Sequence, residues 1–205
     1  STNTVTATIA VGLRPYYTTV VGTKVYVTNG LSNTVSVINA TNNTVTATIP
    51  VGAYPRGIKA HGTDLYVANY GDQNYSGGNS VTVIDSTNNT ISDTIVLPGG
   101  SEGPRGVIVL GDTVYVANYR THNVSVIDTG TNSVIETISV GSGPRGMAVV
   151  GTKVYVENFD DGTISIIDSS DATVESTVAV GHSPAGMGVY GTDIYVTRFQ
   201  DNLVS

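Results

Sequence analysis

The tripeptide Pro-Arg-Gly recurs along this chain, and its spacing limits how the chain can fold. It stands at Pro55–Gly57, Pro104–Gly106 and Pro144–Gly146, and altered copies stand at Pro15–Tyr17 and Pro184–Gly186. Successive prolines are 40, 49, 40 and 40 residues apart. A period near 40 residues indicates supersecondary units that stack on their neighbours to build one core.

Each unit contains four segments rich in β-forming residues. The first follows the Pro-Arg-Gly turn, and the fourth alternates apolar residues with Thr, as in Val45–Ile49. The second segment carries a central Tyr in every copy: Val25–Asn29, Leu65–Asn69, Val114–Asn118, Val154–Asn158 and Ile194–Arg198. The third segment is Val/Ile-rich: Val35–Ile38, Val81–Ile84, Val124–Ile127 and Ile164–Ile167. Four short strands per 40 residues are typical of the blades of a β-propeller.

Tyr26, Val27, Thr28 and Asn29 spell a Tyr-Val-Thr-Asn signature, and the chain resembles the YVTN family of β-propeller repeats. The resemblance extends over nearly every residue. It implies a secreted or cell-surface protein, such as a surface-layer protein, and similar propellers also occur in lactonase-like and lyase enzymes. We therefore expect an all-β fold, a five-bladed β-propeller of four-stranded antiparallel blades, at an extracellular or cell-surface location.

The two ends of the chain are predicted to build one blade together. Thr6–Val11 matches Thr46–Val51, a fourth strand, whereas the segment after Pro184 supplies two strands and the start of a third. We expect Val5–Ile9 to pair with residues 202–205, which closes the ring and hides its sheet edges. The chain is then a single domain, residues 1–205, with repeats at 12–51, 52–97, 98–140, 141–180, and 181–205 plus 1–11.

Composition excludes several classes of function. The net charge is −7, whereas nucleic-acid binding needs clustered Lys and Arg, so we expect no nucleic-acid partner. No apolar run approaches the roughly 20 residues of a membrane helix, so we expect no membrane span. The chain contains no cysteine, which excludes disulfides and cysteine-ligated zinc.

Arginine recurs at one repeat position beside the innermost strand: Arg56, Arg105 and Arg145. We predict that these side chains lie near one mouth of the central channel and prefer anions, such as the carboxylates of acidic glycans. Two structural alternatives stay open. Each guanidinium can bond carbonyls of an adjacent blade, and Glu102 can neutralise Arg105.

Two loops depart from the repeat, Tyr70–Asn79 and Leu97–Gly103, and we expect them to be neighbours on the same face. Binding is often located in such loops, although long surface loops are also tolerated without any function. Four tyrosines lie in loops of this face and are suited to stacking on a sugar: Tyr54, Tyr70, Tyr75 and Tyr119. Tyr70 and Tyr75 join the three arginines as candidate ligand-binding residues.

No pattern in the sequence indicates catalysis or a cofactor. His61, His122 and His182 lie in different loops without zinc-ligand spacing, and Asp160–Gly162 lacks the ordered oxygen spacing of a calcium loop. We therefore expect no metal and no cofactor, and we interpret Asp160–Gly162 as a turn.

The favoured function is that of a non-enzymatic secreted or cell-surface propeller with a structural, assembly or adhesion role. Its expected partners are another copy, at the seam between Ser1 and Ser205, cell-surface components, or a glycan or other anionic ligand. Two alternatives stay open: a small lyase- or lactonase-like enzyme acting at the channel mouth, and a glycan-binding module.

Overall fold

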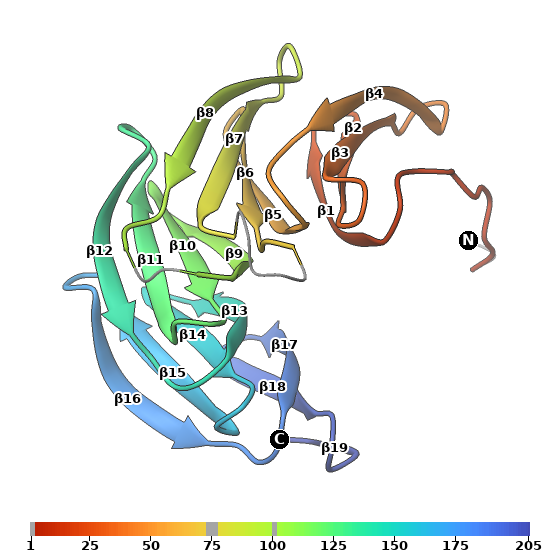
Figure 1. Ribbon diagram of the computed structural model, residues 1–205. Helices are drawn as coiled ribbons and strands as arrows, with labels where there is room; N and C mark the ends of the chain where they lie inside the picture. Colours follow the sequence, from red (N-terminus) through yellow and green to blue (C-terminus); the bar gives the residue numbers. More distant parts are fainter. Residues whose placement is uncertain (1–2, 73–77, 100–101) are drawn as a thin grey trace.

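The computed structural model describes residues 3–72, 78–99 and 102–205. Within these ranges every regular element is a β-strand, and the strands form five antiparallel sheets arranged side by side in an open arc (Figure 1). The described residues include no helix long and apolar enough to cross a membrane. The predicted all-β fold of repeated four-stranded sheets is confirmed for four of the five sheets.

The sheets follow one another in chain order, and the strands within each are hydrogen-bonded in sequence. The first contains β1 (Pro15–Val21), β2 (Lys24–Asn29), β3 (Thr34–Asn39) and β4 (Thr44–Pro50). The second contains β5 (Pro55–His61), β6 (Asp64–Asn69), β7 (Ser80–Asp85) and β8 (Thr90–Val96). The third contains β9 (Pro104–Leu110), β10 (Thr113–Asn118), β11 (Asn123–Asp128) and β12 (Ser133–Ser139). The fourth contains β13 (Pro144–Val150), β14 (Lys153–Asn158), β15 (Thr163–Asp168) and β16 (Thr173–Ala179). The fifth contains β17 (Pro184–Tyr190), β18 (Asp193–Arg198) and β19 (Leu203–Val204).

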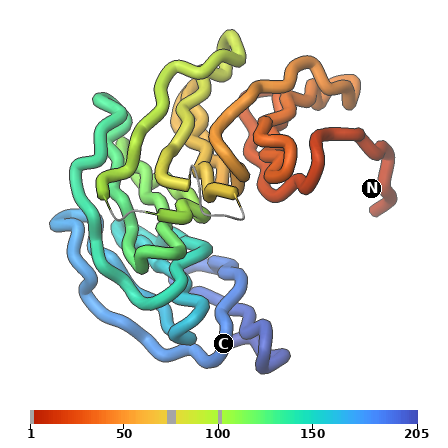
Figure 2. The backbone as a smooth tube through the Cα atoms, viewed as in Figure 1, coloured from red at the N-terminus to blue at the C-terminus, as the bar shows by residue number. Residues whose placement is uncertain are grey.

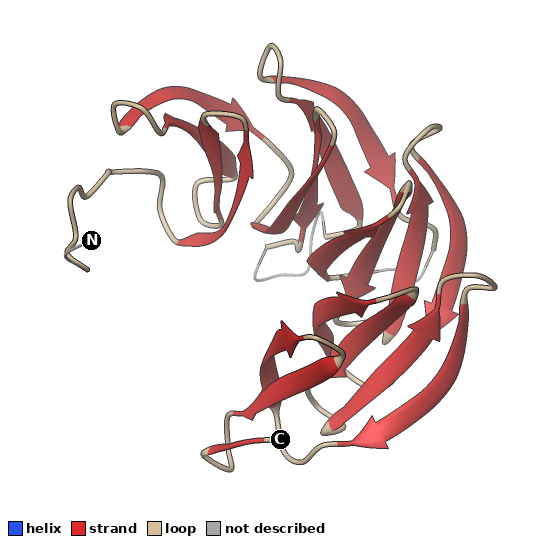
Figure 3. Cartoon of the chain, turned by 180° about the vertical axis from the view of Figure 1, so that it is seen from behind, coloured by secondary structure: helices blue, strands red, loops and turns tan. Residues whose placement is uncertain are grey.

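The first strand of each sheet lies on the inside of the arc and the fourth on its outer rim (Figures 1 and 3). Neighbouring inner strands contact one another, β1 with β5, β5 with β9, β9 with β13 and β13 with β17. The glycine of Pro-Arg-Gly permits this approach, because a Cβ at Gly57 would clash with the Arg105 carbonyl oxygen. Gly106 meets the Arg145 carbonyl oxygen in the same way. The repeated tripeptide therefore sets how closely the inner strands pack.

The repeated tyrosine of the second strand joins consecutive sheets. Tyr26, Tyr66 and Tyr115 are buried in the apolar layers between sheets. The Tyr26 hydroxyl donates to Asn89 Oδ1 of the second sheet at 2.8 Å. Tyr66 donates to Asn132 Oδ1 of the third sheet, also at 2.8 Å. One interlocking arrangement thus recurs from joint to joint.

The Asn that ends the second strand has a structural task within its own sheet. Asn29 Nδ2 donates to Thr34 Oγ1 at 3.1 Å and to Ser36 Oγ at 2.9 Å, across the turn into β3. The asparagines at the equivalent position of the next three sheets make the same pair of bonds: Asn69, Asn118 and Asn158. The signature asparagine therefore belongs to the scaffold.

The predicted pairing of the chain ends is not present. Residues 3–14 form no strand, and the Val5 side chain is 85% exposed. The fifth sheet has three strands, and β19 has no partner on its outer edge among the described residues. Figure 2 shows the two chain ends on opposite sides of the opening of the arc. The five sheets curve too gently to bring Val5–Ile9 to β19.

Candidate anion-binding site

The three predicted arginines lie together, each as the second residue of an inner strand: Arg56 in β5, Arg105 in β9 and Arg145 in β13. All three side chains are half-buried. Since these inner strands are neighbours, the guanidiniums form a consecutive series along the inside of the arc. Tyr16 of β1 and Ala185 of β17 occupy the same repeat position at the two ends of this series.

Aromatic rings surround the arginines. The Arg56 guanidinium carbon lies 4.4 Å from the ring centre of Tyr70 and 4.6 Å from that of Tyr16. The Arg145 guanidinium stacks on Phe159 at 3.1 Å, and Arg105 lies 5.6 Å from Tyr119. Cation–π contacts of this kind hold the cations in place without neutralising them.

The rings also form a row of their own. Centroid distances are 5.7 Å from Tyr16 to Tyr54, 6.2 Å from Tyr54 to Tyr70, and 6.4 Å from Tyr70 to Tyr119. Tyr54 also accepts a hydrogen bond from Arg14 Nη1 at 2.5 Å. We call the three arginines and these rings the arginine–aromatic cluster: Arg56, Arg105, Arg145, Tyr16, Tyr54, Tyr70, Tyr119 and Phe159. Tyr54 is buried, so the aromatic surface beside the positive charge comes from the half-buried rings: Tyr16, Tyr70, Tyr119 and Phe159.

Each arginine keeps a buried donor without a partner. The Nε atoms of Arg56, Arg105 and Arg145 are buried and make no hydrogen bond within the described residues. The proposed bonds to carbonyls of an adjacent sheet are therefore not made by these atoms. Glu102 is exposed and forms no ion pair with Arg105 among the described residues. These Nε donors are therefore unsatisfied by any described residue, and only the outer nitrogens of the guanidiniums are left to face a ligand.

The cations also repel one another. Burial, together with the nearby charges of Arg56 and Arg145, lowers the pKa of Arg105 to about 10. Arg105 is therefore still charged at neutral pH, but at a cost in free energy. An anion bound among the three guanidiniums would relieve this repulsion.

Glu157 is a member of the site that sequence reasoning missed. Its side chain is 2% exposed, its Oε2 accepts the Gly146 N–H at 3.1 Å, and its Oε1 is buried without a partner. Burial raises the pKa of Glu157, against the opposing effects of the Gly146 bond and of Arg105 and Arg145. A signal was present in the sequence, since the other repeats have Thr or Ala at this position: Thr28, Ala68, Ala117 and Thr197.

Sequence reasoning named Tyr70 and Tyr119 but missed that an aromatic residue recurs at one repeat position, directly after the signature asparagine position. Tyr70, Tyr119, Phe159 and Phe199 stand there in four repeats, and the first three contact arginines of the cluster. Arg120, from the same loop as Tyr119, lies 4.5 Å from the Tyr70 ring. Tyr75, the remaining predicted ligand-binding residue, lies outside the described residues.

The histidines and the Asp160–Gly162 loop act within the scaffold. His122 Nδ1 accepts the Gly143 N–H at 3.0 Å, and Asp161 accepts the Ser142 N–H at 2.6 Å. His182 pairs with Asp201 at 3.2 Å. In the part of the chain that the structure describes, no three His, Cys, Asp or Glu side chains are grouped so as to hold a metal ion.

Comparison with known proteins identifies the fold. No family model matches the sequence, and no curated protein matches it. Hydrazine synthase of Kuenenia stuttgartiensis has a TM-score of 0.78 at 23% identity, over 94% of this chain and 57% of that chain. The computationally designed Ika8 protein has a TM-score of 0.73 at 13% identity, over 91% of this chain and 56% of that chain. BamB of Moraxella catarrhalis has a TM-score of 0.71 at 16% identity, over 94% of this chain and 56% of that chain. The chain thus spans little more than half the length of these structures. Hydrazine synthase and BamB are β-propeller proteins, so the fold of this chain is that of a β-propeller.

Proposed function

We propose that this protein is a non-enzymatic, secreted or cell-surface β-propeller that adheres to acidic glycans through the arginine–aromatic cluster. One observation carries the proposal. Three half-buried guanidiniums, each with an unpartnered Nε, lie beside a continuous row of aromatic rings. The extracellular location rests on the resemblance to YVTN repeats and on a composition rich in Thr, Asn and Ser.

A uronic acid polymer combines the two features that the cluster can recognise. Its carboxylates suit bidentate pairing with guanidinium groups, and its pyranose rings offer apolar faces that stack on tyrosine. The chain as a whole carries −7, so the arginines form a local field of opposite sign along the inner strands. Such a field selects anionic over neutral sugars.

The enzymatic alternative needs a base close to the bound carboxylate, and Tyr16 beside Arg56 is the candidate. Burial and the hydrogen bond to Tyr54 raise the pKa of Tyr16 above its ordinary value. A tyrosine that holds its proton more firmly is a poorer general base at neutral pH. This direction of the Tyr16 pKa shift counts against lyase chemistry with Tyr16 as the base.

The test is a calorimetric titration with a short uronic acid oligomer and a neutral oligomer of equal length, at low and moderate salt. We expect binding of the acidic oligomer only, weakened by salt, and reduced about tenfold or more by Arg105→Gln. Lys59→Gln is the matched control, since it removes one exposed positive charge from the strand that carries Arg56. Equal binding of both oligomers, or equal effects of both substitutions, would refute the proposal, and shortened or unsaturated products would establish the enzyme instead.

A further inference from the structure

A polar pocket of about 440 Å³ lies where loops of the fourth and fifth sheets meet, next to the arginine–aromatic cluster. The turn from β14 to β15 lines it with residues 159–162, and the connection from β16 to β17 lines it with Gly181, His182 and Ser183. The turn from β18 to β19 adds Gln200. The volume is in the range of small-molecule sites, roughly 300–1,000 Å³.

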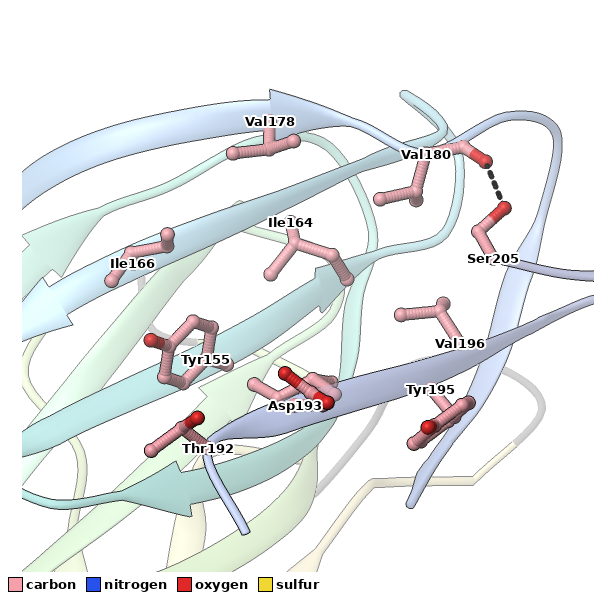
Figure 4. Close-up of a pocket in the computed structure, with 11 residues that line it drawn as sticks. Tyr155, Ile164, Ile166, Val178, Val180, Thr192, Asp193, Tyr195, Val196 and Ser205 are labelled. Atoms are coloured by element: carbon pink, nitrogen blue, oxygen red, sulfur yellow. Dashed lines mark hydrogen bonds between the residues drawn. The ribbon is translucent and has the colours of Figure 1, made fainter. Parts of the chain in front are cut away.

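This pocket is separate from an apolar groove of about 470 Å³ between the strands of the same two sheets (Figure 4). Tyr155 and Ile164 are among the residues that line the groove. Val180 also lines the groove, whereas its chain neighbours Ala179 and Gly181 line the pocket. The segment that leaves β16 therefore divides the two cavities, and the pocket is the one formed by loops.

A backbone donor in the pocket lacks the acceptor that its counterparts have. The residue before the proline of each inner strand has a left-handed φ, and at the three preceding joints its N–H is bonded to the connection between the second and third strands. The bonds are Tyr54 to Asn33 Oδ1 at 2.9 Å, Gly103 to the Gly78 carbonyl at 2.8 Å, and Gly143 to His122 Nδ1 at 3.0 Å. Ser183 is the equivalent residue at the fourth joint, is only 7% exposed, and its N–H donates to no described residue. Buried N–H groups without an acceptor are rare in proteins.

The adjoining turn cannot supply this acceptor from a side chain. Gly162 stands at the repeat position of Asn33 and His122. A Cβ at Gly162 would lie 2.6 Å from the Gly181 carbonyl oxygen, so no side chain fits there. The Ser183 N–H is therefore open to an acceptor on a bound molecule.

Two carboxylates determine which molecule the pocket favours. Asp160 Oδ1 accepts the Tyr119 hydroxyl at 3.3 Å, and Asp161 Oδ2 accepts the Ser142 N–H at 2.6 Å. Both aspartates are exposed, and the second oxygen of each receives no hydrogen bond from a described residue. Carboxylates accept hydrogen bonds from the hydroxyls of a sugar, and they repel another carboxylate. The pocket therefore favours a neutral sugar over a uronic acid.

Phe159 connects the pocket to the arginine–aromatic cluster. Its ring centre lies 3.1 Å from the Arg145 guanidinium carbon, and the same residue lines the pocket. The bond between Tyr119 and Asp160 makes a second connection. A glycan with a carboxylate at Arg145 therefore leads its next residue towards the pocket, where the half-buried ring of Phe159 is suited to stacking on a pyranose.

We propose that the pocket binds a neutral, N-acetylated sugar that neighbours a uronic acid in the same glycan. The Ser183 N–H donates to the acetamido carbonyl, Asp160 and Asp161 accept sugar hydroxyls, and Phe159 packs on the ring. The uronic acid neighbour rests on the proposed function, whereas the sugar in the pocket rests on the pocket's own contacts. The preferred ligand is therefore an acidic glycan in which the two kinds of sugar alternate.

The first test is calorimetry with two tetrasaccharides, one of alternating glucuronate and N-acetylglucosamine and one of galacturonate alone. We expect the alternating tetrasaccharide to bind at least about tenfold more tightly, although it carries fewer carboxylates. Asp160→Asn should remove this preference, because it weakens the hydroxyl contact and relieves the repulsion of a uronic acid. Asp93→Asn on the outer strand β8 is the matched control, since it removes one exposed carboxylate far along the chain from the pocket and should leave the preference within about twofold.

Equal binding of the two tetrasaccharides, or tighter binding of galacturonate, overturns this proposal and leaves the proposed function standing. An equal loss of the preference in Asp160→Asn and Asp93→Asn overturns it as well. Binding of neither tetrasaccharide overturns the proposed function, and the second test then decides on the pocket.

The second test observes the Ser183 amide by nitrogen-15 NMR during titration with the methyl glycoside of N-acetylglucosamine. The Ser183 amide proton should move downfield as it gains an acceptor, and the Gly143 amide, already bonded to His122, should move less. The methyl glycoside of glucose, which lacks the acetamido group, is the matched probe and should move Ser183 less. The shift should persist in Arg105→Gln, because it requires no guanidinium. A Ser183 resonance that stays in place with both the N-acetylated glycoside and the alternating tetrasaccharide, or that moves equally with the glucoside, overturns the proposal.

Discussion

Replacing Arg105 by methionine separates a ligand-binding role of the cluster from a scaffold role. The structure lowers the pKa of Arg105 from its ordinary value to about 10, chiefly through burial and then through Arg56 and Arg145. At about 1.4 kcal/mol for each tenfold change, this corresponds to a cost of roughly 3 kcal/mol for holding the charge in the folded state. The side chain is only half-buried, so solvent screening reduces the cost to about 1–2 kcal/mol.

Arg105→Met should therefore stabilise the ligand-free protein by about 1–2 kcal/mol, and raise its melting temperature by about 3–6 °C for a chain of this size. It should at the same time abolish binding of the uronic acid oligomer. The cost is present in full below pH 10 and declines as the pH rises above 10 towards the ordinary pKa of arginine, because over that range the unfolded chain binds more protons than the folded one. Urea unfolding at neutral pH measures the effect, with the exposed Lys59→Met as the control.

A loss of stability of more than about 1 kcal/mol in Arg105→Met would refute this reasoning. It would show that the guanidinium supports the packing of the inner strands and that its charge is not a burden. Unchanged affinity for the oligomer in the variant would refute the ligand role separately.

Three further predictions concern the scaffold around the cluster. Tyr66→Phe should lower the free energy of unfolding by about 1 kcal/mol, because it removes a hydrogen bond between sheets. Tyr115→Phe is the control and should change this free energy little, because Ala172 stands where the other joints have the acceptor asparagine. Urea unfolding measures both. Because burial raises the pKa of Glu157, the wild-type protein should lose stability as the pH rises above the ordinary value of 4.5. Glu157→Gln removes this loss, so its melting temperature should increase relative to that of wild type between pH 4.5 and 8. Gly57→Ala should cost about 2 kcal/mol or more by its clash with the inner strand β9, whereas Gly188→Ala, with no atom within 4 Å of the added Cβ, should not.

The scaffold was predictable from the sequence because each of its devices is local and repeated. The Tyr of the second strand buries an apolar ring and carries a polar hydroxyl. The Asn that ends this strand bonds residues across the connection to the third strand, as Asn29 does with Thr34 and Ser36. Closure of the ring was not predictable in this way. It depends on small rotations summed over all sheets, and a register match between residues 4–9 and 44–49 carries no information on that sum.

The site was predictable only in part, for a related reason. The series of arginines follows from one repeat position on adjacent inner strands, so the period alone brings Arg56, Arg105 and Arg145 together. Glu157 was missed because its position lies inside the Tyr-containing strand, which the pattern marks as core. Only the fold shows that this position faces the inner strand carrying Gly146.

A comparison between repeats also indicates which residues the scaffold requires. A side chain needed for the joint between sheets should recur in every copy, as the tyrosine of the second strand does. Arginine does not recur in every copy. Tyr16 and Ala185 occupy its position in the first and fifth sheets, and the first two strands of these sheets pair as they do in the other sheets. Pairing of the first two strands therefore does not need a guanidinium, yet three consecutive sheets carry one, and burial lowers the pKa of the middle one, Arg105. A series of partly buried charges that strand pairing does not require is best explained by what it binds.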